Sequence, residues 1–199
     1  MTHTKAMGSP AEKIESTSRF AAYLAIERET GIKHEYHAGN FVAMAGGTPV
    51  HSLVAMNIGG ELRSQLLGKP CQPHGSDFRI RAEGSAFYPD VMVVCPPPKL
   101  DPELPNTLLN PRVIVEVLSP STESHDRSFK WFHYQQIPEL MDFLLVSPDS
   151  RTIEHYHRQD DSSWLYQKLG EGDTIELATI ECSVAVSGCF SGMELWEAQ

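Results

Sequence analysis

The chain has 199 residues, of which 41% are hydrophobic and 21% are charged, and its formal net charge is −10. These values fit one globular domain, expected to span residues 17–199, and the apolar runs are far shorter than the roughly 20 residues of a membrane span. We therefore expect a cytoplasmic protein with no membrane contact. Because broad binding of a phosphate backbone depends on Lys and Arg, the negative net charge means that any contact with nucleic acid must be local.

The first part of the chain predicts a tail, two helices and a hairpin. Residues 1–16 are polar, small and aperiodic, so we expect a disordered tail. Helical spacing of apolar residues predicts one helix from Thr17 or Ser18 to about Gly31 and a second over 49–67, whose buried stripe is Val54, Ile58, Leu62 and Leu66. Residues 33–36 and 41–44 predict the two strands of a hairpin.

The second part predicts strands around one further helix. Strands are expected at 75–80, 87–94, 112–118 and 141–146, and short ones near 151–158, 163–169 and 174–186. The Pro-rich residues 96–111 predict a long surface loop. Ser121 or Thr122 is the expected cap of a helix that runs to about Gln136, with Phe129 and Phe132 on its apolar side. This order predicts an α/β or α+β domain with a mixed central β-sheet flanked by helices.

Cysteines and histidines give no clear metal motif. Cys71, Cys95, Cys182 and Cys189 lie in or beside apolar segments and lack CxxC spacing, so we expect four buried free thiols. The pairs His34/His37 and His155/His157 have spacings that arise by chance among nine histidines. Neither pair is interpreted as a metal site.

Two acidic residues stand in apolar strand-like segments. Asp90 begins one segment, and Glu116 lies inside the run Val113–Val117, where a buried carboxylate needs a partner. Two carboxylates on neighbouring strands repel each other and favour a hard divalent cation such as Mg²⁺, which can promote phosphodiester hydrolysis. The structural alternative is that Asp90 bonds to backbone amides and Glu116 pairs with an arginine such as Arg79 or Arg81.

A lysine beside such a metal would stabilise developing charge, and the plainest motif places it at position 118, which is leucine here. Lys130 is the candidate instead, because Asp126, Lys130 and Tyr134 share one face of the predicted helix. From spacing alone, a solvated Asp126–Lys130 pair is the favoured interpretation. Glu35 is more commonly an exposed strand residue than a ligand, and His51 a capping or surface histidine.

Several motifs together resemble a known family. They are Lys33-His34-Glu35-Tyr36, Val42-Ala43-Met44-Ala45-Gly46-Gly47 with His51, Gly75-Ser76-Asp77, Tyr88-Pro89-Asp90-Val91, Asn110-Pro111, Val115-Glu116-Val117-Leu118-Ser119-Pro120-Ser121-Thr122, the trio Asp126/Lys130/Tyr134, and Leu144-Leu145-Val146. The pattern, over about residues 18–190, resembles the Uma-two (Uma2) family of restriction-endonuclease-like proteins. The resemblance implies a PD-(D/E)xK nuclease core in which Asp90 and Glu116 bind a divalent metal and the lysine is displaced to Lys130.

We therefore expect an endonuclease, dependent on Mg²⁺ or Mn²⁺, that hydrolyses phosphodiester bonds in DNA. In this hypothesis Asp90, Glu116 and the backbone carbonyl of Val117 hold the metal, and Lys130 positions or activates water. Glu35, His51, Asp126 and Tyr134 are supporting residues. The alternatives are a non-catalytic nucleic-acid-binding or regulatory module that retains the nuclease fold, and hydrolysis of a small phosphorylated molecule.

A homodimer is also expected, because many nucleases of this fold cut duplexes as two-fold dimers. The apolar segments Val184–Phe190 and Met193–Trp196 are the candidate interface.

Overall fold

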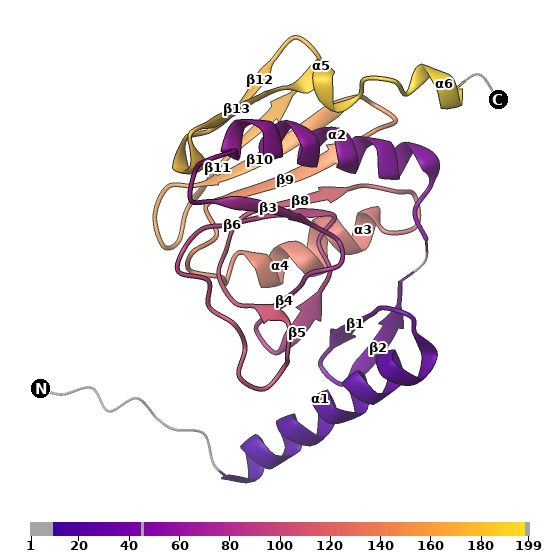
Figure 1. The fold of residues 1–199 in the computed structure, drawn as a ribbon, viewed down its shortest axis with the longest axis vertical. Coiled ribbons are helices and arrows are strands. Elements are labelled where there is room, and N and C mark those ends of the chain that lie inside the picture. Colours follow the sequence, from indigo (N-terminus) through magenta and orange to yellow (C-terminus); the bar gives the residue numbers. More distant parts are fainter. Residues whose placement is uncertain (1–9, 45, 198–199) are drawn as a thin grey trace, which may run out of the picture.

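The computed structural model describes residues 10–44 and 46–197 and shows helices packed on mixed β-sheets (Figure 1). The predicted order of helix, hairpin, helix, strands, helix and strands is found, with further short elements that were not predicted, and the fold class is α+β with mixed sheets flanked by helices. Within the described residues, no helix is both long enough and apolar enough to cross a bilayer.

The central sheet has six strands in the order β11-β10-β9-β8-β6-β3. Strands β8 and β9 are parallel and the other neighbours are antiparallel. The predicted strands at 112–118, 141–146, 151–158 and 163–169 are therefore confirmed within a few residues. The six strands are β3 (Gln72–Gly75), β6 (Val91–Val94), β8 (Pro111–Val117), β9 (Asp142–Ser147), β10 (Thr152–Arg158) and β11 (Trp164–Leu169).

Strand β8 is buried on both faces, which explains its continuous apolar sequence. Val113, Val115 and Val117 pack into one core cluster and Ile114 and Leu118 into another. Successive side chains of a strand point to opposite faces. The side chain of Glu116 therefore faces the same side of the sheet as Ile114 and Leu118.

Helix α2 (Pro49–Leu66) covers the face formed by Val113, Val115 and Val117 (Figure 1). Its buried residues are the predicted stripe Val54, Ile58, Leu62 and Leu66. The C-terminal elements complete this layer: β12 (Thr174–Leu177), the 3₁₀ turn η2 (Ala178–Ile180), β13 (Cys182–Ala185), α5 (Val186–Cys189) and α6 (Glu194–Glu197).

The expected dimer interface lies mostly inside this layer. Val184, Val186, Phe190 and Met193 are buried in the core cluster with α2. They serve the chain's own core because they complete the cover of the sheet. Of the large apolar residues in these segments, Leu195 (71% exposed) and Trp196 (41% exposed) remain on the surface.

The opposite face of the central sheet is covered by one helical segment: α3 (Glu123–His125), the π-helical turn η1 (Asp126–Lys130) and α4 (Trp131–Tyr134). Thr122 occupies the N-cap position, but its side chain makes no capping hydrogen bond. Phe129 packs against the core as predicted, whereas Phe132 is 58% exposed, so its predicted place on the apolar side is wrong. The face turned inward carries Asp126, Lys130 and Tyr134 instead.

A second sheet of five strands, in the order β2-β1-β5-β4-β7, packs with helix α1 (Pro10–Thr30). Its strands are β1 (His34–His37), β2 (Asn40–Ala43), β4 (Arg79–Ala82), β5 (Ser85–Phe87) and β7 (Thr107–Leu108). The predicted hairpin is confirmed as β1–β2, whereas the expected strands at 75–80 and 87–94 are divided between the two sheets.

Two segments in this region differ from the prediction. Helix α1 begins at Pro10, so it includes residues 10–16 of the expected tail, and residues 1–9 lie outside the described residues. The expected loop 96–111 contains β7, which pairs with β4, and buries Leu104 and Leu108. Because these two leucines are buried, the Pro-rich segment is part of the packed fold and is not a simple surface loop.

The cysteines also divide into two kinds. Cys71 and Cys95 form a disulfide, so the prediction of free thiols is wrong for these two. Cys71 precedes β3 and Cys95 follows β6, and the antiparallel pairing of these two strands brings the cysteines together. Cys182 and Cys189 are buried free thiols, as expected.

Candidate functional site

The ammonium group of Lys130 lies among three carboxylates between the two sheets and the helical segment. Its Nζ atom is 3.1 Å from Glu35 Oε1, 3.2 Å from Glu116 Oε1 and 3.0 Å from Asp126 Oδ1. The four side chains are at most 8% exposed. Glu35 is thus not an exposed strand residue, and Asp126–Lys130 is not a solvated pair, so both interpretations that spacing favoured are wrong.

The π-helical turn brings Asp126 and Lys130 to the same inner face. A π-helical turn closes with an i→i+5 hydrogen bond, and here the backbone N–H of Trp131 donates to the carbonyl of Asp126. Tyr134 follows in α4, and its hydroxyl donates a 2.6 Å hydrogen bond to Glu116 Oε1. The predicted trio Asp126, Lys130 and Tyr134 is therefore confirmed as one face, directed at Glu116.

Asp90 reaches the same region from the turn that precedes β6. Val91 pairs with Val115 in antiparallel register, which places Asp90 beside Glu116. Asp90 Oδ2 accepts a 2.7 Å hydrogen bond from the backbone N–H of Val117. The structural alternative for Asp90, a bond to a backbone amide, is thus confirmed as a contact, and this contact also holds the carboxylate beside Glu116.

His51 lies beside Asp90, in the first turn of α2. Its Nε2 atom is 3.2 Å from Asp90 Oδ2, and its backbone N–H is capped by Thr48 Oγ1. The hydrogen bond with Asp90 raises the pKa of His51, although burial opposes the shift. At 14% exposure, Asp90 is more open to solvent than Glu35, Glu116 or Asp126, so the site reaches the surface on this side.

We call Glu35, Asp90, Glu116 and Asp126 the acidic cluster. Burial raises the pKa of Glu116; Lys130 opposes this shift, and the charges of Asp126 and Asp90 add to it. Burial alone would lower the pKa of Lys130, but Glu116, Glu35 and Asp126 raise it well above its usual value. Lys130 therefore stays charged, yet one ammonium does not balance four carboxylates.

The donor atoms of this site suit a hard divalent cation. Glu35 Oε1 and Asp126 Oδ1 are buried, and each contacts the ammonium group of Lys130. Oxygen ligands are those that Mg²⁺ and Mn²⁺ prefer, and neighbouring carboxylates favour a cation because it relieves their repulsion. The residues present therefore fit a divalent metal.

The two arginines considered as partners of Glu116 lie elsewhere. Arg79 pairs with Glu27 at 2.7 Å, and its guanidinium also donates to the hydroxyls of Tyr23 and Tyr88. Arg81 pairs with Asp101 at 2.7 Å. The predicted arginine partner of Glu116 is wrong, because Lys130 and Tyr134 fill that role.

Two histidines near the acidic cluster were missed by sequence reasoning. His37 Nε2 is 3.4 Å and His125 Nε2 is 3.5 Å from Glu35 Oε2. The sequence paired His37 with His34, but the fold brings it to His125. No local spacing links residues 37 and 125, so only the tertiary structure reveals this group.

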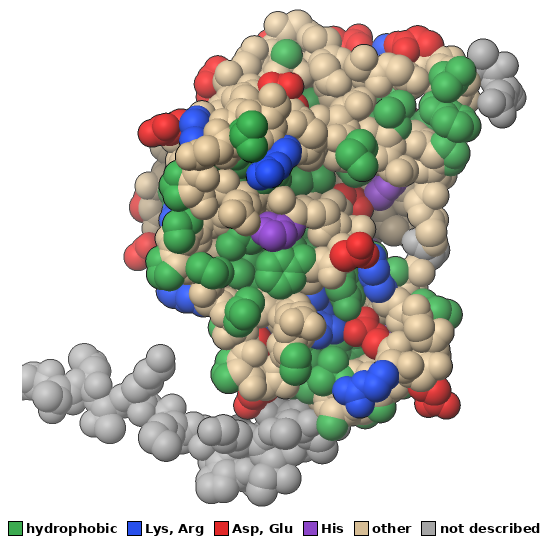
Figure 2. Space-filling view, in the orientation of Figure 1, with side chains coloured by type: hydrophobic (Ala, Val, Ile, Leu, Met, Phe, Trp, Pro, Cys, Tyr) green, Lys and Arg blue, Asp and Glu red, His purple; other side chains and the backbone are tan. Residues whose placement is uncertain are grey.

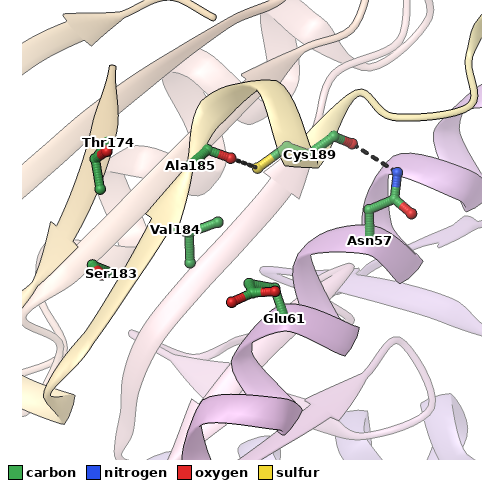
Figure 3. Close-up of a pocket in the computed structure, with 8 residues that line it drawn as sticks. Asn57, Glu61, Thr174, Ser183, Val184, Ala185 and Cys189 are labelled. Atoms are coloured by element: carbon green, nitrogen blue, oxygen red, sulfur yellow. Dashed lines mark hydrogen bonds between the residues drawn. The ribbon is translucent and has the colours of Figure 1, made fainter. Parts of the chain in front are cut away.

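A surface pocket of about 510 Å³ lies apart from the acidic cluster, between α2 and the C-terminal elements (Figure 3). Asn57 crosses one side of it and donates hydrogen bonds to the carbonyls of Cys189 and Ser191. One acid, Glu61, lines this pocket, and no member of the acidic cluster does. The pocket therefore lacks the paired carboxylates on which the chemistry depends.

Comparisons with known proteins show the family to which the chain is similar. The model of the Uma2 family, described as "Putative restriction endonuclease", matches residues 20–187. "Uncharacterized protein slr1290" of Synechocystis is 38% identical over 86% of this chain and 90% of that protein, and "Uncharacterized protein sll1609" is 33% identical over 79% and 91%.

A solved structure is also similar to this chain. It is a protein of Anabaena variabilis described as "a putative nuclease belonging to DUF820". The TM-score is 0.66 at 16% sequence identity, with 81% of this chain and 91% of the other covered. At this identity the likeness shows a shared fold.

Proposed function

Because the chain belongs to the Uma2 family, we propose that it is a metal-dependent endonuclease that hydrolyses phosphodiester bonds in DNA. The observation that carries the proposal is the convergence of Glu35, Glu116 and Asp126 on Lys130. A buried lysine among more carboxylates than it can balance is typical of a reactive centre and not of a core built for stability.

In this proposal, Asp90, Glu116 and the backbone carbonyl of Val117 hold Mg²⁺ or Mn²⁺. A metal bound there would polarise the phosphate and lower the pKa of a coordinated water. The hydrogen bond from Val117 N–H fixes Asp90, and the Tyr134 hydroxyl fixes Glu116, so both carboxylates are oriented before substrate arrives. Such preorganisation lowers the cost of reaching the transition state.

Lys130 positions water or stabilises the charge that develops on the phosphate. It remains protonated because its carboxylate neighbours raise its pKa, so it acts as a cation and hydrogen-bond donor in the resting site. Substrate would approach from the side of Asp90 and His51, which are more exposed than the rest of the site. His51 is suited to orient Asp90 there.

The surface charge favours local contact with the nucleic acid. On the face shown in Figure 2, Lys and Arg side chains stand singly and do not form a continuous basic stripe. Together with the net charge of −10, this distribution favours recognition of a short stretch around the scissile phosphate. The same charge is the reason to include a small phosphodiester among the test substrates.

A cleavage assay with purified protein tests the proposal. Supercoiled plasmid, linear duplex, single-stranded DNA, RNA and a small phosphodiester are each incubated with Mg²⁺ or Mn²⁺ and with a chelator. We expect metal-dependent cleavage of DNA that Asp90→Asn and Glu116→Gln abolish and that Asp77→Asn, at an exposed position, leaves intact. Intact substrates under every condition would contradict the proposal.

The same variants separate the enzyme from a non-catalytic module that keeps the fold. Metal titration by calorimetry should show Mn²⁺ binding that depends on Asp90 and Glu116. Binding of DNA without any dependence on metal or on these residues would favour the binding module. Cleavage of the small phosphodiester alone would move the substrate class away from DNA.

We extend the proposal to a homodimer and to a cytoplasmic location. Leu195 and Trp196 are the exposed apolar residues that remain for a C-terminal interface. Light scattering coupled to size exclusion measures the mass in solution. A monomeric mass at micromolar concentration would contradict the dimer.

A further inference from the structure

Two histidines on different elements face the same oxygen of Glu35. His37 ends strand β1, and His125 ends helix α3. Their Nε2 atoms lie 3.4 Å and 3.5 Å from Glu35 Oε2, and the three ligand atoms all lie within 4.8 Å of one another. The other oxygen of Glu35 faces Lys130, so this group borders the acidic cluster without including Asp90 or Glu116.

Three ring nitrogens of these histidines make no well-formed hydrogen bond, although both Nε2 atoms contact Glu35 Oε2 at 3.4 Å and 3.5 Å. Among the described residues, neither Nδ1 nor Nε2 of His37 has a hydrogen-bond partner, and His125 Nε2 has none. The His37 side chain is 9% exposed, so water compensates little. A buried polar group without a partner costs free energy, which calls for an explanation such as a bound ion.

Aromatic contacts hold the two rings in place. The His37 ring packs edge-on against Phe129 at 4.7 Å between centroids, and the His125 ring stacks on the same Phe129 at 5.0 Å. Phe87 contacts His37 from another side. The rings are thus fixed by packing on their faces, while their Nε2 atoms stay directed at Glu35.

The two distances from Glu35 to the histidines match those between ligands around one small cation. Zinc binds imidazole nitrogen and carboxylate oxygen at about 2.0–2.2 Å in tetrahedral geometry, which puts neighbouring ligand atoms about 3.3–3.5 Å apart. Two imidazoles and one carboxylate are ligands that such a borderline cation accepts. His125 is 36% exposed, so an ion can enter on its side and keep a fourth position for water.

A second histidine group in the protein shows the contrast. His155 Nε2 and His157 Nδ1 lie 2.8 Å and 2.7 Å from Asp142 Oδ1, which are hydrogen-bond distances. The other oxygen of Asp142 accepts from the Thr179 hydroxyl. This group is satisfied as it stands, and it has no need of an ion.

We propose that Glu35, His37 and His125 form a second metal site, which binds Zn²⁺ or a similar borderline divalent cation such as Co²⁺. The site differs in ligand chemistry from the oxygen-only site at Asp90 and Glu116. An ion held there fixes Glu35, and Glu35 in turn contacts Lys130 at 3.1 Å. Metal binding itself does not depend on the proposed nuclease activity; only this link to Lys130 rests on it.

Cobalt spectroscopy on the full-length, metal-free protein tests the site. We expect Co²⁺ titration to give the visible absorption of a four- or five-coordinate site, and Zn²⁺ to remove it by displacement. His37→Gln and His125→Gln should each weaken Co²⁺ binding by more than about 100-fold, the upper end of the loss seen for outer partners of a metal. His157→Gln is the matched control and should keep the wild-type spectrum.

Three results of these measurements would contradict the second metal site. An absent Co²⁺ spectrum, an unchanged spectrum in both His37→Gln and His125→Gln, or its loss in His157→Gln would overturn the proposal. His125→Gln keeps the test decisive if His37→Gln fails to fold, because His125 is more exposed. Asp90→Asn should abolish nuclease activity and retain the Co²⁺ spectrum, so failure of the nuclease proposal does not imply failure of this one.

Discussion

The Nζ atom of Lys130 lies 3.2 Å from Glu116 Oε1, although one residue belongs to a helical turn and the other to a strand of the central sheet. Leu118, two residues after Glu116, occupies the position where the plainest motif has its lysine, and here it packs in the core beside Tyr134 and Phe143. The helical segment that covers the sheet therefore supplies the ammonium group, and the strand does not. The site depends on how helix and sheet pack.

Replacing Lys130 by methionine keeps a long side chain and removes the ammonium group. We expect the cleavage rate to fall by at least about 100-fold, because electrostatic stabilisation of the phosphate is lost. The unfolding free energy should also fall, by about 3–5 kcal/mol, since the buried carboxylates lose their cation. Cleavage kinetics and chemical denaturation measure the two effects.

The matched control for that change is Lys99→Met, because Lys99 is 58% exposed and pairs with Glu139 on the surface. It should alter the unfolding free energy by less than about 1 kcal/mol. A Lys130→Met protein that cleaves at the wild-type rate would remove Lys130 from the proposed mechanism.

The change Tyr134→Phe removes only the hydroxyl that donates to Glu116. Burial, followed by the charge of Glu116, raises the pKa of Tyr134, so the hydroxyl is a donor across the working pH range. We expect the loss of this donor to cost about 1–3 kcal/mol of stability and to weaken Mn²⁺ binding about 10-fold. Calorimetry measures the affinity, with Tyr166→Phe at a half-exposed site as control. Equal affinities would contradict the orienting role.

Arg79 is the centre of a buried network between α1 and the five-stranded sheet. Its guanidinium contacts Glu27, Tyr23 and Tyr88, and donates to Thr107 on β7. Replacing it by alanine should lower the unfolding free energy by about 3–5 kcal/mol, because the largely buried charge of Glu27 would lose its cation. Metal affinity of the folded protein should not change. Arg81→Ala, at a more exposed pair, should cost less, and the reverse order would contradict this account.

The disulfide between Cys71 and Cys95 predicts how many cysteine thiols react in the denatured protein. Denatured protein kept without reductant should show two reactive thiols, and reduced protein four. The bond closes a loop of sequence separation 24, so its reduction should lower stability by about 3 kcal/mol. The variant with Cys71→Ser and Cys95→Ser should not respond to reductant. Four thiols in the unreduced protein would show that the bond does not form.

Local pattern predicted the elements whose burial is periodic. The stripe from Val54 to Leu66 marks α2 because one face of a helix repeats every three to four residues. The strand 112–118 was predicted because both of its faces are apolar. In contrast, the hairpin of β4 and β5 around Glu83-Gly84, where both residues have positive φ, was not predicted, because residues 81–86 were expected to lie between two strands.

The sequence singled out the residues of this site but did not predict that they are buried together. Asp126 and Lys130 have the spacing of a surface pair, and nothing in that spacing shows that Glu35 and Glu116 arrive from two sheets to surround them. Contacts of this kind depend on tertiary packing. The family motifs pointed to these residues, and the structure explains why they belong together.

The π-helical turn from Asp126 to Lys130 accommodates one extra residue without displacing the helix that follows. Its i→i+5 hydrogen bonding holds one residue more per closed turn than an α-helix. Deleting a single residue such as Ser128 would let this turn close as an ordinary α-helical turn, while the residues before and after it keep their relative orientation. Tyr134 would then stay at Glu116, whereas a one-codon deletion within the regular helix α2 would rotate everything after it by about 100°.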